Sequence, residues 1–230
     1  MVYVQEILDN MKICVIIPVY NESRTIGSLV AEIKEEGLDV LVIDDGSLDN
    51  TAQVAKARGA HVIKNEANKG KGISLARGFD HALSHNFDAV ITMDGDGQHL
   101  ASDIAKFIHR AAASDNGIFI GNRMIKVKNM PWLRLLTNKF MSWLISIIAR
   151  QDIPDSQCGF RLIKKQILEK IHLKTSKFEA ESEILLQASR LGFKIESVSV
   201  STVYKGEKSK INPVTDTIRF ASFILRELTR

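Results

Sequence analysis

Phe87-Asp88-Ala89-Val90-Ile91-Thr92-Met93-Asp94-Gly95-Asp96-Gly97-Gln98 joins a short apolar run to a turn rich in acids and glycines. The apolar part is typical of a strand buried on both faces of a parallel sheet. Asp94, Asp96 and Gln98 alternate with glycines, so an extended backbone projects their oxygens to the same side. Hard divalent cations prefer such oxygen ligands. The stretch therefore predicts a strand that ends at a metal site, and the alternative is a solvated turn.

Similar apolar runs alternate with helical patterns on both sides of this stretch. Strands are predicted at residues 13–17, 40–43, 61–63, 89–93 and 118–120. Helical spacing of apolar residues predicts helices at residues 26–33, 50–59, 73–83 and 104–111. Buried strands separated by helices imply right-handed crossovers between parallel strands. The sequence thus predicts an α/β fold, a single Rossmann-like domain with a mainly parallel central sheet flanked by helices.

The second half of the chain has a less regular pattern. It predicts helices at residues 163–171 and 181–191, a strand at residues 194–203 and a terminal amphipathic helix from residue 213 to 228. We divide the chain into an N-terminal extension (1–11), the main domain (12–212) and a C-terminal helix (213–230). The first ten residues do not resemble a signal peptide, and no apolar run has the length of a membrane-spanning helix.

Polar clusters follow three of the predicted strands directly. They lie at residues 18–22, 44–47 and 94–98. In parallel α/β sheets, ligands bind beyond the carboxyl ends of the strands, so we expect the clusters to meet at one edge. Asp44 or Asp45 is placed there to accept hydrogen bonds from a base or a ribose, as acidic residues do in other doubly wound folds.

The basic residues of this chain are unevenly distributed. The 230 residues carry a net charge of +4, and two cysteines make no disulfide framework, so we expect a reducing, cytoplasmic location. Residues 121–150 include aromatic and aliphatic side chains but no acid. The six bases of that segment are Arg123, Lys126, Lys128, Arg134, Lys139 and Arg150. This mixture suits a membrane surface or a lipid phosphate, or else a core helix with a basic polar face. No motif that reads nucleic acid is present, and we expect no nucleic-acid partner.

Four short motifs follow one another along residues 12–212. They are Pro18-Val19-Tyr20-Asn21-Glu22, Asp44-Asp45-Gly46-Ser47, Asn68-Lys69-Gly70-Lys71-Gly72 and Asp94-Gly95-Asp96-Gly97-Gln98. In this order and spacing they resemble the family two glycosyltransferases. The resemblance implies a GT-A fold, a nucleotide-sugar donor, a divalent metal (Mg²⁺ or Mn²⁺) and inversion at the anomeric carbon. Whether the donor is a GDP-sugar or a UDP-sugar stays open.

Two later motifs resemble one group within that family, the polyprenyl-phosphate sugar synthases, which include the dolichol-phosphate mannosyltransferases. They are Asp155-Ser156-Gln157-Cys158-Gly159-Phe160-Arg161 and Ser209-Lys210-Ile211. The segment before the second motif departs from the dolichol type, which tends to show an arginine there, and Lys205 or Lys208 is expected to take the basic role. Many relatives append transmembrane helices that this sequence lacks. We therefore expect any membrane contact to be peripheral, on the cytoplasmic face.

The resemblance also implies roles for single residues on the donor side. The metal would neutralise the charge that builds on the departing diphosphate. Its expected ligands are Asp94, Asp96 and Gln98, with Asp96 also counted as catalytic. The residues expected to line the nucleoside site, or to form the close-approach loop beside it, are Pro18, Tyr20, Glu22, Gly70 and Lys71.

On the acceptor side, Arg123 and Arg161 are expected to hold the phosphate of a polyprenyl (dolichyl or undecaprenyl) phosphate, because arginine binds phosphate in a bidentate manner. Such a phosphate is ionised at neutral pH and attacks without a general base. Glu183 is the candidate base if the acceptor is instead a hydroxyl, as in surface polysaccharide or glycolipid assembly. A third alternative is an inactive module that binds nucleotides or a membrane surface.

Overall fold

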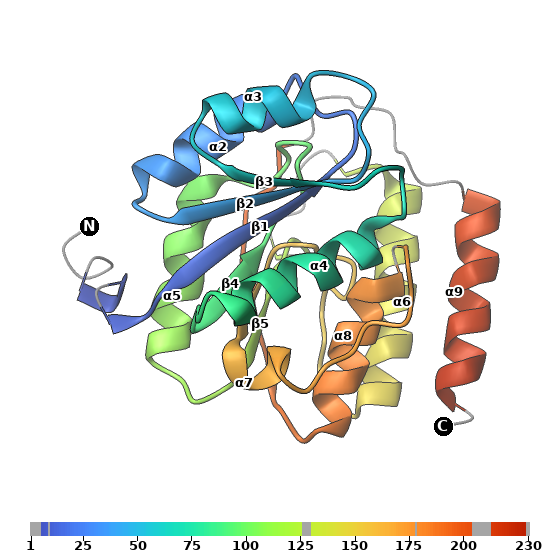
Figure 1. The fold of residues 1–230 in the computed structure, drawn as a ribbon. Helices are drawn as coiled ribbons and strands as arrows, with labels where there is room; N and C mark the ends of the chain where they lie inside the picture. Colours follow the sequence, from blue (N-terminus) through green and yellow to red (C-terminus); the bar gives the residue numbers. More distant parts are fainter. Residues whose placement is uncertain (1–5, 9, 126–129, 178, 204–212, 229–230) are drawn as a thin grey trace.

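Seven strands form one sheet in the order β3-β2-β1-β4-β6-β5-β7. The computed structural model describes residues 6–8, 10–125, 130–177, 179–203 and 213–228. The strands are β1 (Ile13–Val19), β2 (Asp39–Asp44), β3 (His61–Lys64), β4 (Ala89–Thr92), β5 (Ile118–Asn122), β6 (Arg161–Lys164) and β7 (Ile195–Ser199). Figure 1 shows β1 to β5 crossing the middle of the molecule. The predicted α/β fold with its central sheet is confirmed.

Strand β6 departs from the sequence-based prediction. It pairs antiparallel with both β4 and β5, whereas the other described pairs of the sheet are parallel. The helix predicted at residues 163–171 is therefore wrong in its first part, and only the short α7 (Lys165–Leu168) is helical there. Leu162 and Ile163 are fully buried on opposite faces of the sheet. A short apolar run of this kind fits a buried strand as well as a helix.

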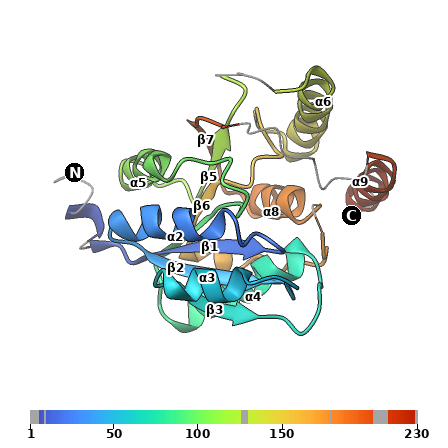
Figure 2. The same ribbon diagram turned by 90° about the horizontal axis from the view of Figure 1, so that it is seen from above.

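The helices form one layer on each face of the sheet. Those whose buried side chains join the first hydrophobic core are α2 (Ile26–Glu35), α3 (Thr51–Ala57) and α5 (Ile104–Ala112). Those that join the second are α4 (Lys71–Ser84), α6 (Trp132–Ala149), α7, α8 (Glu179–Arg190) and α9 (Pro213–Leu228). Figure 1 shows α2 and α3 on one side of β1 and β2 and α4 on the other. The view from above shows α9 outside α8 (Figure 2).

Strand β1 lies at the centre and contributes to both cores. Val15 and Ile17 face the layer of α2 and α5, whereas Cys14 and Ile16 face the layer of α4. The alternation follows from the period of two of an extended chain. A Cβ atom at Gly78 of α4 would lie 2.6 Å from Cγ2 of Ile16, so glycine allows α4 to pack closely on β1.

Most of the remaining predicted elements are present. The C-terminal helix spans Pro213–Leu228 as predicted, and the strand predicted at residues 194–203 is the shorter β7. Along the described part of the chain, no helix combines the length and the apolar composition needed to cross a bilayer.

Candidate active site

The loops that follow β1, β2 and β4 are tied together at one edge of the sheet. The amide of Asn21 donates to Oγ of Ser47 (2.9 Å), which joins the loops after β1 and β2. The hydroxyl of Thr25 donates to the carbonyl oxygen of Gly95 (2.6 Å), which joins the loops after β1 and β4. The three polar clusters therefore converge, as the strand order predicts.

Asp45 organises the loop that leads into α4. Its Oδ1 accepts hydrogen bonds from Nδ2 of Asn65 (2.8 Å) and from the amide of Lys69 (2.9 Å). Its Oδ2 accepts one from the amide of Gly70 (2.8 Å). A buried carboxylate that accepts several hydrogen bonds stabilises the backbone conformation around it. Asp45 thus sets the shape of the predicted donor loop from within.

Asp44 is fully buried beside it. Its Oδ1 accepts a hydrogen bond from the amide of Ser47 (2.8 Å), and its Oδ2 lies 3.7 Å from Nζ of Lys64. Both carboxylates therefore hold loops of the predicted nucleoside site. That either of them contacts a base or a ribose stays a prediction, and so does the role of the half-buried Pro18, Tyr20 and Glu22 at the end of β1.

The glycines of the Gly70-Lys71-Gly72 loop permit a close approach to another segment of the chain. Gly70 has a φ of +98°, and a Cβ atom there would lie 2.2 Å from the carbonyl oxygen of Ser176. The amide of Gly72 donates to the same oxygen (2.9 Å). In the structure the glycine loop therefore packs against the segment before α8. This packing brings Lys71, at the start of α4, close to the first turn of α8.

Lys71 links two carboxylates at the centre of the site. Its ammonium donates to Oδ1 of Asp94 and to Oε1 of Glu181. Burial disfavours the charged form, but Asp94 and Glu181 outweigh it and raise the pKa of Lys71 above its ordinary value. A Cβ atom at Gly159 would lie 2.7 Å from Oδ2 of Asp94 and 2.9 Å from Oε1 of Glu181. The Asp155–Arg161 motif therefore packs directly against this ion-paired cluster.

Glu181 was not among the predicted site residues. The acids at the start of α8 follow the common preference of helix N-termini for negative charge, so the sequence gives little sign of a site there. The alternation of Glu179, Glu181 and Glu183 is the one available signal, and it does not tell which of the three reaches Lys71.

The residues of the metal motif fit a cation that the donor would help to coordinate. Burial, and then the charge of Asp94, raise the pKa of Asp96, whereas at Asp94 burial is outweighed, chiefly by the charge of Lys71, and the pKa is lowered. Asp96 also accepts a hydrogen bond from the amide of the half-buried Gln98 (3.0 Å). Among the described residues, no group of three or more His, Cys, Asp or Glu is arranged to hold a metal. Mg²⁺ is commonly bound by one or two carboxylates together with substrate phosphates, which this pair can supply.

Arg123, predicted to hold the acceptor phosphate, is buried in an ion pair with Asp155. Its Nε and one terminal nitrogen donate to the two oxygens of Asp155 at 2.7 and 2.8 Å. Its amide also donates to the same carboxylate (3.1 Å). To bind a phosphate, the guanidinium would have to release or share Asp155. The described contacts of Arg123 link the end of β5 to the Asp155–Arg161 motif, and that it binds the acceptor phosphate stays a prediction.

Arg161 is also fully buried and contacts main-chain oxygens. Its three nitrogens donate to the carbonyl oxygens of Cys158 (2.8 Å), Glu181 (2.5 Å) and Ser156 (2.8 Å). These bonds hold the loop before β6 against the first turn of α8. In the structure Arg161 therefore links these two segments, and that it holds the acceptor phosphate stays a prediction.

Glu183, the candidate base, is engaged within its own neighbourhood. Its carboxylate accepts hydrogen bonds from the amides of Lys174 and Thr175, from Oγ1 of Thr175 (2.7 Å) and from Nε2 of Gln187 (3.0 Å). The side chain is 1% exposed. Glu183 therefore shapes the segment that Gly70 and Gly72 approach.

Replacement of Glu183 by glutamine tests which role it has. We expect a loss of about 1–3 kcal/mol in the free energy of unfolding, because a buried acceptor network is disturbed. The dependence of the transfer rate on pH should match that of the wild type. A rate loss of about a hundredfold or more with an altered pH profile would instead identify a general base. Glu179→Gln, one turn earlier in the same helix, is the control.

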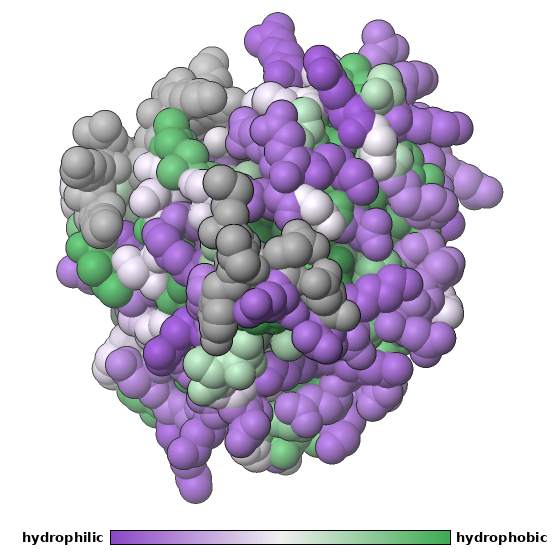
Figure 3. Space-filling model, turned by 90° about the vertical axis from the view of Figure 1, so that its left-hand side faces the viewer, coloured by the Kyte–Doolittle hydropathy of each residue, from purple (hydrophilic) through white to green (hydrophobic). Residues whose placement is uncertain are grey.

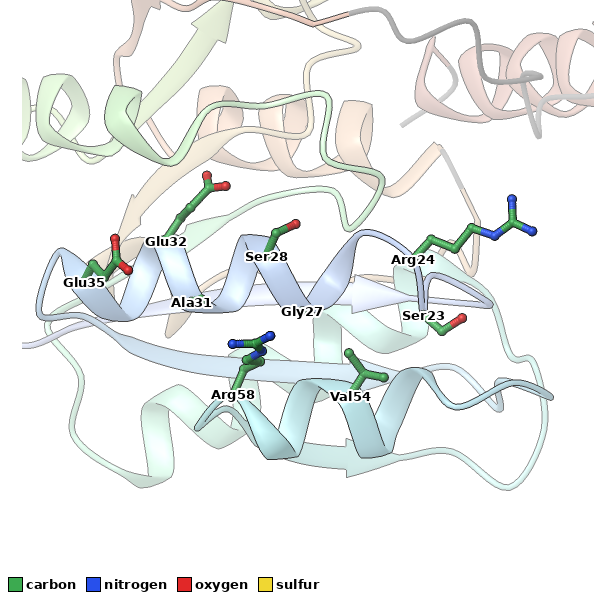
Figure 4. Close-up of a pocket in the computed structure, with 9 residues that line it drawn as sticks. All are labelled: Ser23, Arg24, Gly27, Ser28, Ala31, Glu32, Glu35, Val54 and Arg58. Atoms are coloured by element: carbon green, nitrogen blue, oxygen red, sulfur yellow. The ribbon is translucent and has the colours of Figure 1, made fainter.

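A hollow of 480 Å³ lies between α2 and α3 (Figure 4). Charged side chains line it at both ends, with Arg24 near the start of α2 and Glu32, Glu35 and Arg58 further along. None of the predicted site residues is part of its lining. We therefore do not assign it to the active site.

The chain matches known glycosyltransferases in sequence and in fold. The model of the family described as glycosyl transferase family 2 matches residues 14–172. A UDP-N-acetylglucosamine–dolichyl-phosphate N-acetylglucosaminyltransferase of Methanococcus voltae is 30% identical over 84% of this chain and 86% of its own length. A dolichol-phosphate mannosyltransferase of Pyrococcus furiosus is 33% identical over 77% of this chain and 53% of its own length.

Among solved structures, glucosyl-3-phosphoglycerate synthase from Mycobacterium tuberculosis, in complex with UDP, superimposes with a TM-score of 0.79. The match covers 97% of this chain and 82% of that one, at 19% identity, so it supports the fold alone. The sequence motifs, the converging loops and the family match agree with one another. The chain therefore belongs to glycosyl transferase family 2 and is a glycosyltransferase with a GT-A fold.

Proposed function

We propose that this enzyme transfers a sugar from a nucleotide sugar to a polyprenyl phosphate, with a divalent metal and inversion at the anomeric carbon. The observation that carries the proposal is the pair Asp94 and Asp96 at the end of β4, beside the ammonium of Lys71. The names of the two relatives, each with a dolichol-based phosphate, support the choice of acceptor. Structures of the fold neighbour were obtained with Mg²⁺ or Mn²⁺ and UDP, which supports the choice of metal.

Asp94 and Asp96 would hold the metal, which would stabilise the charge on the departing diphosphate as a Lewis acid. Lys71 donates to Asp94, so this carboxylate would contact both Lys71 and the metal. With a cation held there, the ammonium of Lys71 would lie beside the diphosphate, and its positive charge would help to neutralise the leaving group. Glu181 keeps Lys71 near the site throughout, because it accepts from the same ammonium. The chain thus supplies one positive charge of its own at the leaving group.

The proposal also specifies the chemical class of the acceptor, a lipid phosphate. A lipid phosphate is ionised at neutral pH and needs no base, whereas a hydroxyl acceptor needs one. The carboxylate of Glu183 is occupied by backbone and side-chain donors, and that of Glu181 by Lys71. This favours a phosphate over the hydroxyl acceptor of polysaccharide or glycolipid assembly. An inactive module is disfavoured by the family, whose named relatives are transferases.

A polyprenyl phosphate resides in a bilayer, so the enzyme would work at a membrane surface. We propose peripheral association with the cytoplasmic face. Several residues expected to take part lie outside the described residues and stay predictions: Lys126, Lys128, Lys205, Lys208 and the motif at residues 209–211.

Binding of the nucleotide tests the donor half of the proposal. We expect UDP or GDP to bind with a micromolar to millimolar dissociation constant in the presence of Mg²⁺, as is usual for enzyme substrates. Asp45→Ala removes three hydrogen bonds from the donor loop and should weaken binding at least about tenfold, since a lost bond to a charged group costs about 1.5–3 kcal/mol. Isothermal titration calorimetry measures both.

Asp39→Ala is the matched control, because Asp39 lies exposed at the start of β2, the strand that Asp45 follows. It should leave the affinity unchanged. Absence of heat with either nucleotide would contradict the donor assignment, and equal binding by the Asp45→Ala variant would contradict the role of this loop.

A further inference from the structure

Helix α6 turns a mixed face of small polar and apolar residues toward the protein. Asn138, Ser142, Ile145 and Ala149 are buried on its inner face. The amide of Ser156 donates to Oγ of Ser142 (2.9 Å), and Oγ of Ser146 donates to the carbonyl oxygen of Ile153 (3.2 Å). The inner face of α6 thus already packs on the protein, as in any surface helix, so large apolar side chains on its outer face come in addition to those that the fold buries.

Large apolar side chains occupy the outer face of the same helix. Six of them are between 54% and 75% exposed, and we call them the α6 stripe: Trp132, Leu133, Leu136, Phe140, Trp143 and Ile147. At 3.6 residues per turn they fall within about a third of the helix circumference. Phe140 and Trp143 contact each other, with ring centroids 5.9 Å apart. By contrast, the side of the molecule drawn in Figure 3 is mostly hydrophilic, with apolar residues in small separate patches. A continuous exposed apolar surface of this kind marks an interaction site.

The charged residues of α6 itself are of one sign. Helix α6 contains Arg134 and Lys139 and no acid, and Arg150 follows its last residue. Lys139 and Arg150 are exposed. A second copy of this chain, docked through the same face, would bring these bases against each other, which is unfavourable in an isologous interface. An anionic lipid surface complements both the charge and the apolar character of the face.

The stripe is also connected to the active site. Strand β5 ends at the edge of the sheet where the site lies, and α6 follows within ten residues. The inner face of α6 contacts the segment from Ile153 to Ser156, which includes Asp155, the partner of Arg123. Helix α6 packs on α8, whose first turn carries Glu181 (Figures 1 and 2). A surface bound to α6 would therefore lie next to the acceptor side of the site.

We propose that α6 lies in the headgroup region of an anionic bilayer, with the α6 stripe inserted among the lipids. The inference rests on the proposed function in one respect, namely that the acceptor is a lipid. Trp132 and Trp143 suit the boundary between headgroups and hydrocarbon, where tryptophan is enriched. Lys139 and Arg150 would face the anionic headgroups. The helix thus docks parallel to the membrane, without crossing it.

The test is co-sedimentation of the full chain with vesicles of phosphatidylcholine, with and without phosphatidylglycerol. The wild type should bind the anionic vesicles at low salt and lose part of that binding in high salt, because only the electrostatic contribution is screened. The double variant Leu136→Glu/Trp143→Glu should lower the partition coefficient at least about tenfold. Leu136→Ser/Trp143→Ser, which adds no charge, should lower it in the same direction. All four substitutions fall on exposed side chains.

The matched control is Gln53→Glu/Ala57→Glu on α3, which adds the same charge on the opposite layer at exposed positions. It should bind vesicles as the wild type does. Wild-type protein that stays in the supernatant at low salt would overturn the proposal, and so would unchanged binding by the stripe variants. A wild-type dimer that the stripe variants dissociate, with no vesicle binding, would identify a second copy as the occupant and overturn it as well.

A transfer assay separates this inference from the proposed function. With polyprenyl phosphate in vesicles, the stripe variants should lose transfer in proportion to their loss of binding. With a short, water-soluble prenyl phosphate they should keep the wild-type rate within about twofold, because the α6 stripe is outside the catalytic residues. If no prenyl phosphate serves as acceptor for the wild type, the proposed function is wrong. The co-sedimentation result then tests by itself whether α6 docks on a membrane.

Discussion

Replacement of Asp96 by alanine is expected to lower the rate of sugar transfer at least about a hundredfold, because it removes a main stabiliser of transition-state charge. Asp96 lies beside Asp94 after the end of β4, and burial together with the charge of Asp94 raises the pKa of Asp96. Loss of one of these carboxylates should weaken the binding of the metal and also the binding of the nucleotide sugar that helps to coordinate it. Initial rates with saturating Mg²⁺, together with Mn²⁺ binding by calorimetry, measure the two effects.

Asp80→Ala is the control for this variant, since it removes an exposed carboxylate from α4 and leaves the site intact. It should keep the wild-type rate and the wild-type affinity for Mn²⁺. Excess EDTA should abolish transfer by the wild type and by the control alike. Full activity of Asp96→Ala, or of the wild type in EDTA, would contradict the role assigned to this carboxylate.

Replacement of Asp155 by alanine should lower the free energy of unfolding by about 3–5 kcal/mol, the usual cost of removing one partner of a buried ion pair. The carboxylate of Asp155 is fully buried and accepts two side-chain bonds and one backbone bond from Arg123. Its loss leaves a buried guanidinium without this counter-charge. Urea unfolding followed by circular dichroism measures the change.

Two further variants identify the cause of that loss. Asp152→Ala, at an exposed position in the same segment, should change the free energy by no more than about 0.5 kcal/mol. Arg123→Met/Asp155→Leu replaces the pair by apolar side chains and should recover most of the loss. A cost below about 1 kcal/mol for Asp155→Ala would show that the pair does not hold the Asp155–Arg161 motif in place.

The edge of the sheet that carries the site could be predicted from local pattern. The apolar runs of β1, β2 and β4 are followed at once by polar clusters, and parallel strands bring such clusters together. Hydrogen bonds between Asn21 and Ser47 and between Thr25 and Gly95 confirm this convergence. Strand β6 could not be predicted in the same way, because its four residues run into α7 and read as one helical pattern.

The environment of the charged residues depended on contacts between distant segments. Arg123 and Arg161 have the residue type of a phosphate site, but Asp155 and three carbonyl oxygens occupy their donors. Glu181 and Glu183 are two positions apart, yet the first reaches Lys71 and the second holds Lys174 and Thr175. Which carboxylate lies in the site is decided by how α4 and α8 pack.

The most direct test of the central claim is a transfer assay with a panel of labelled UDP- and GDP-sugars, Mg²⁺ and polyprenyl phosphate, followed by organic extraction and chromatography of the lipid fraction. We predict a labelled polyprenyl-phosphate sugar with at least one donor. The product should be absent without the lipid phosphate, absent in excess EDTA and strongly reduced for Asp96→Ala. No lipid-linked product with any donor, while a water-soluble hydroxyl acceptor becomes labelled instead, would contradict the account.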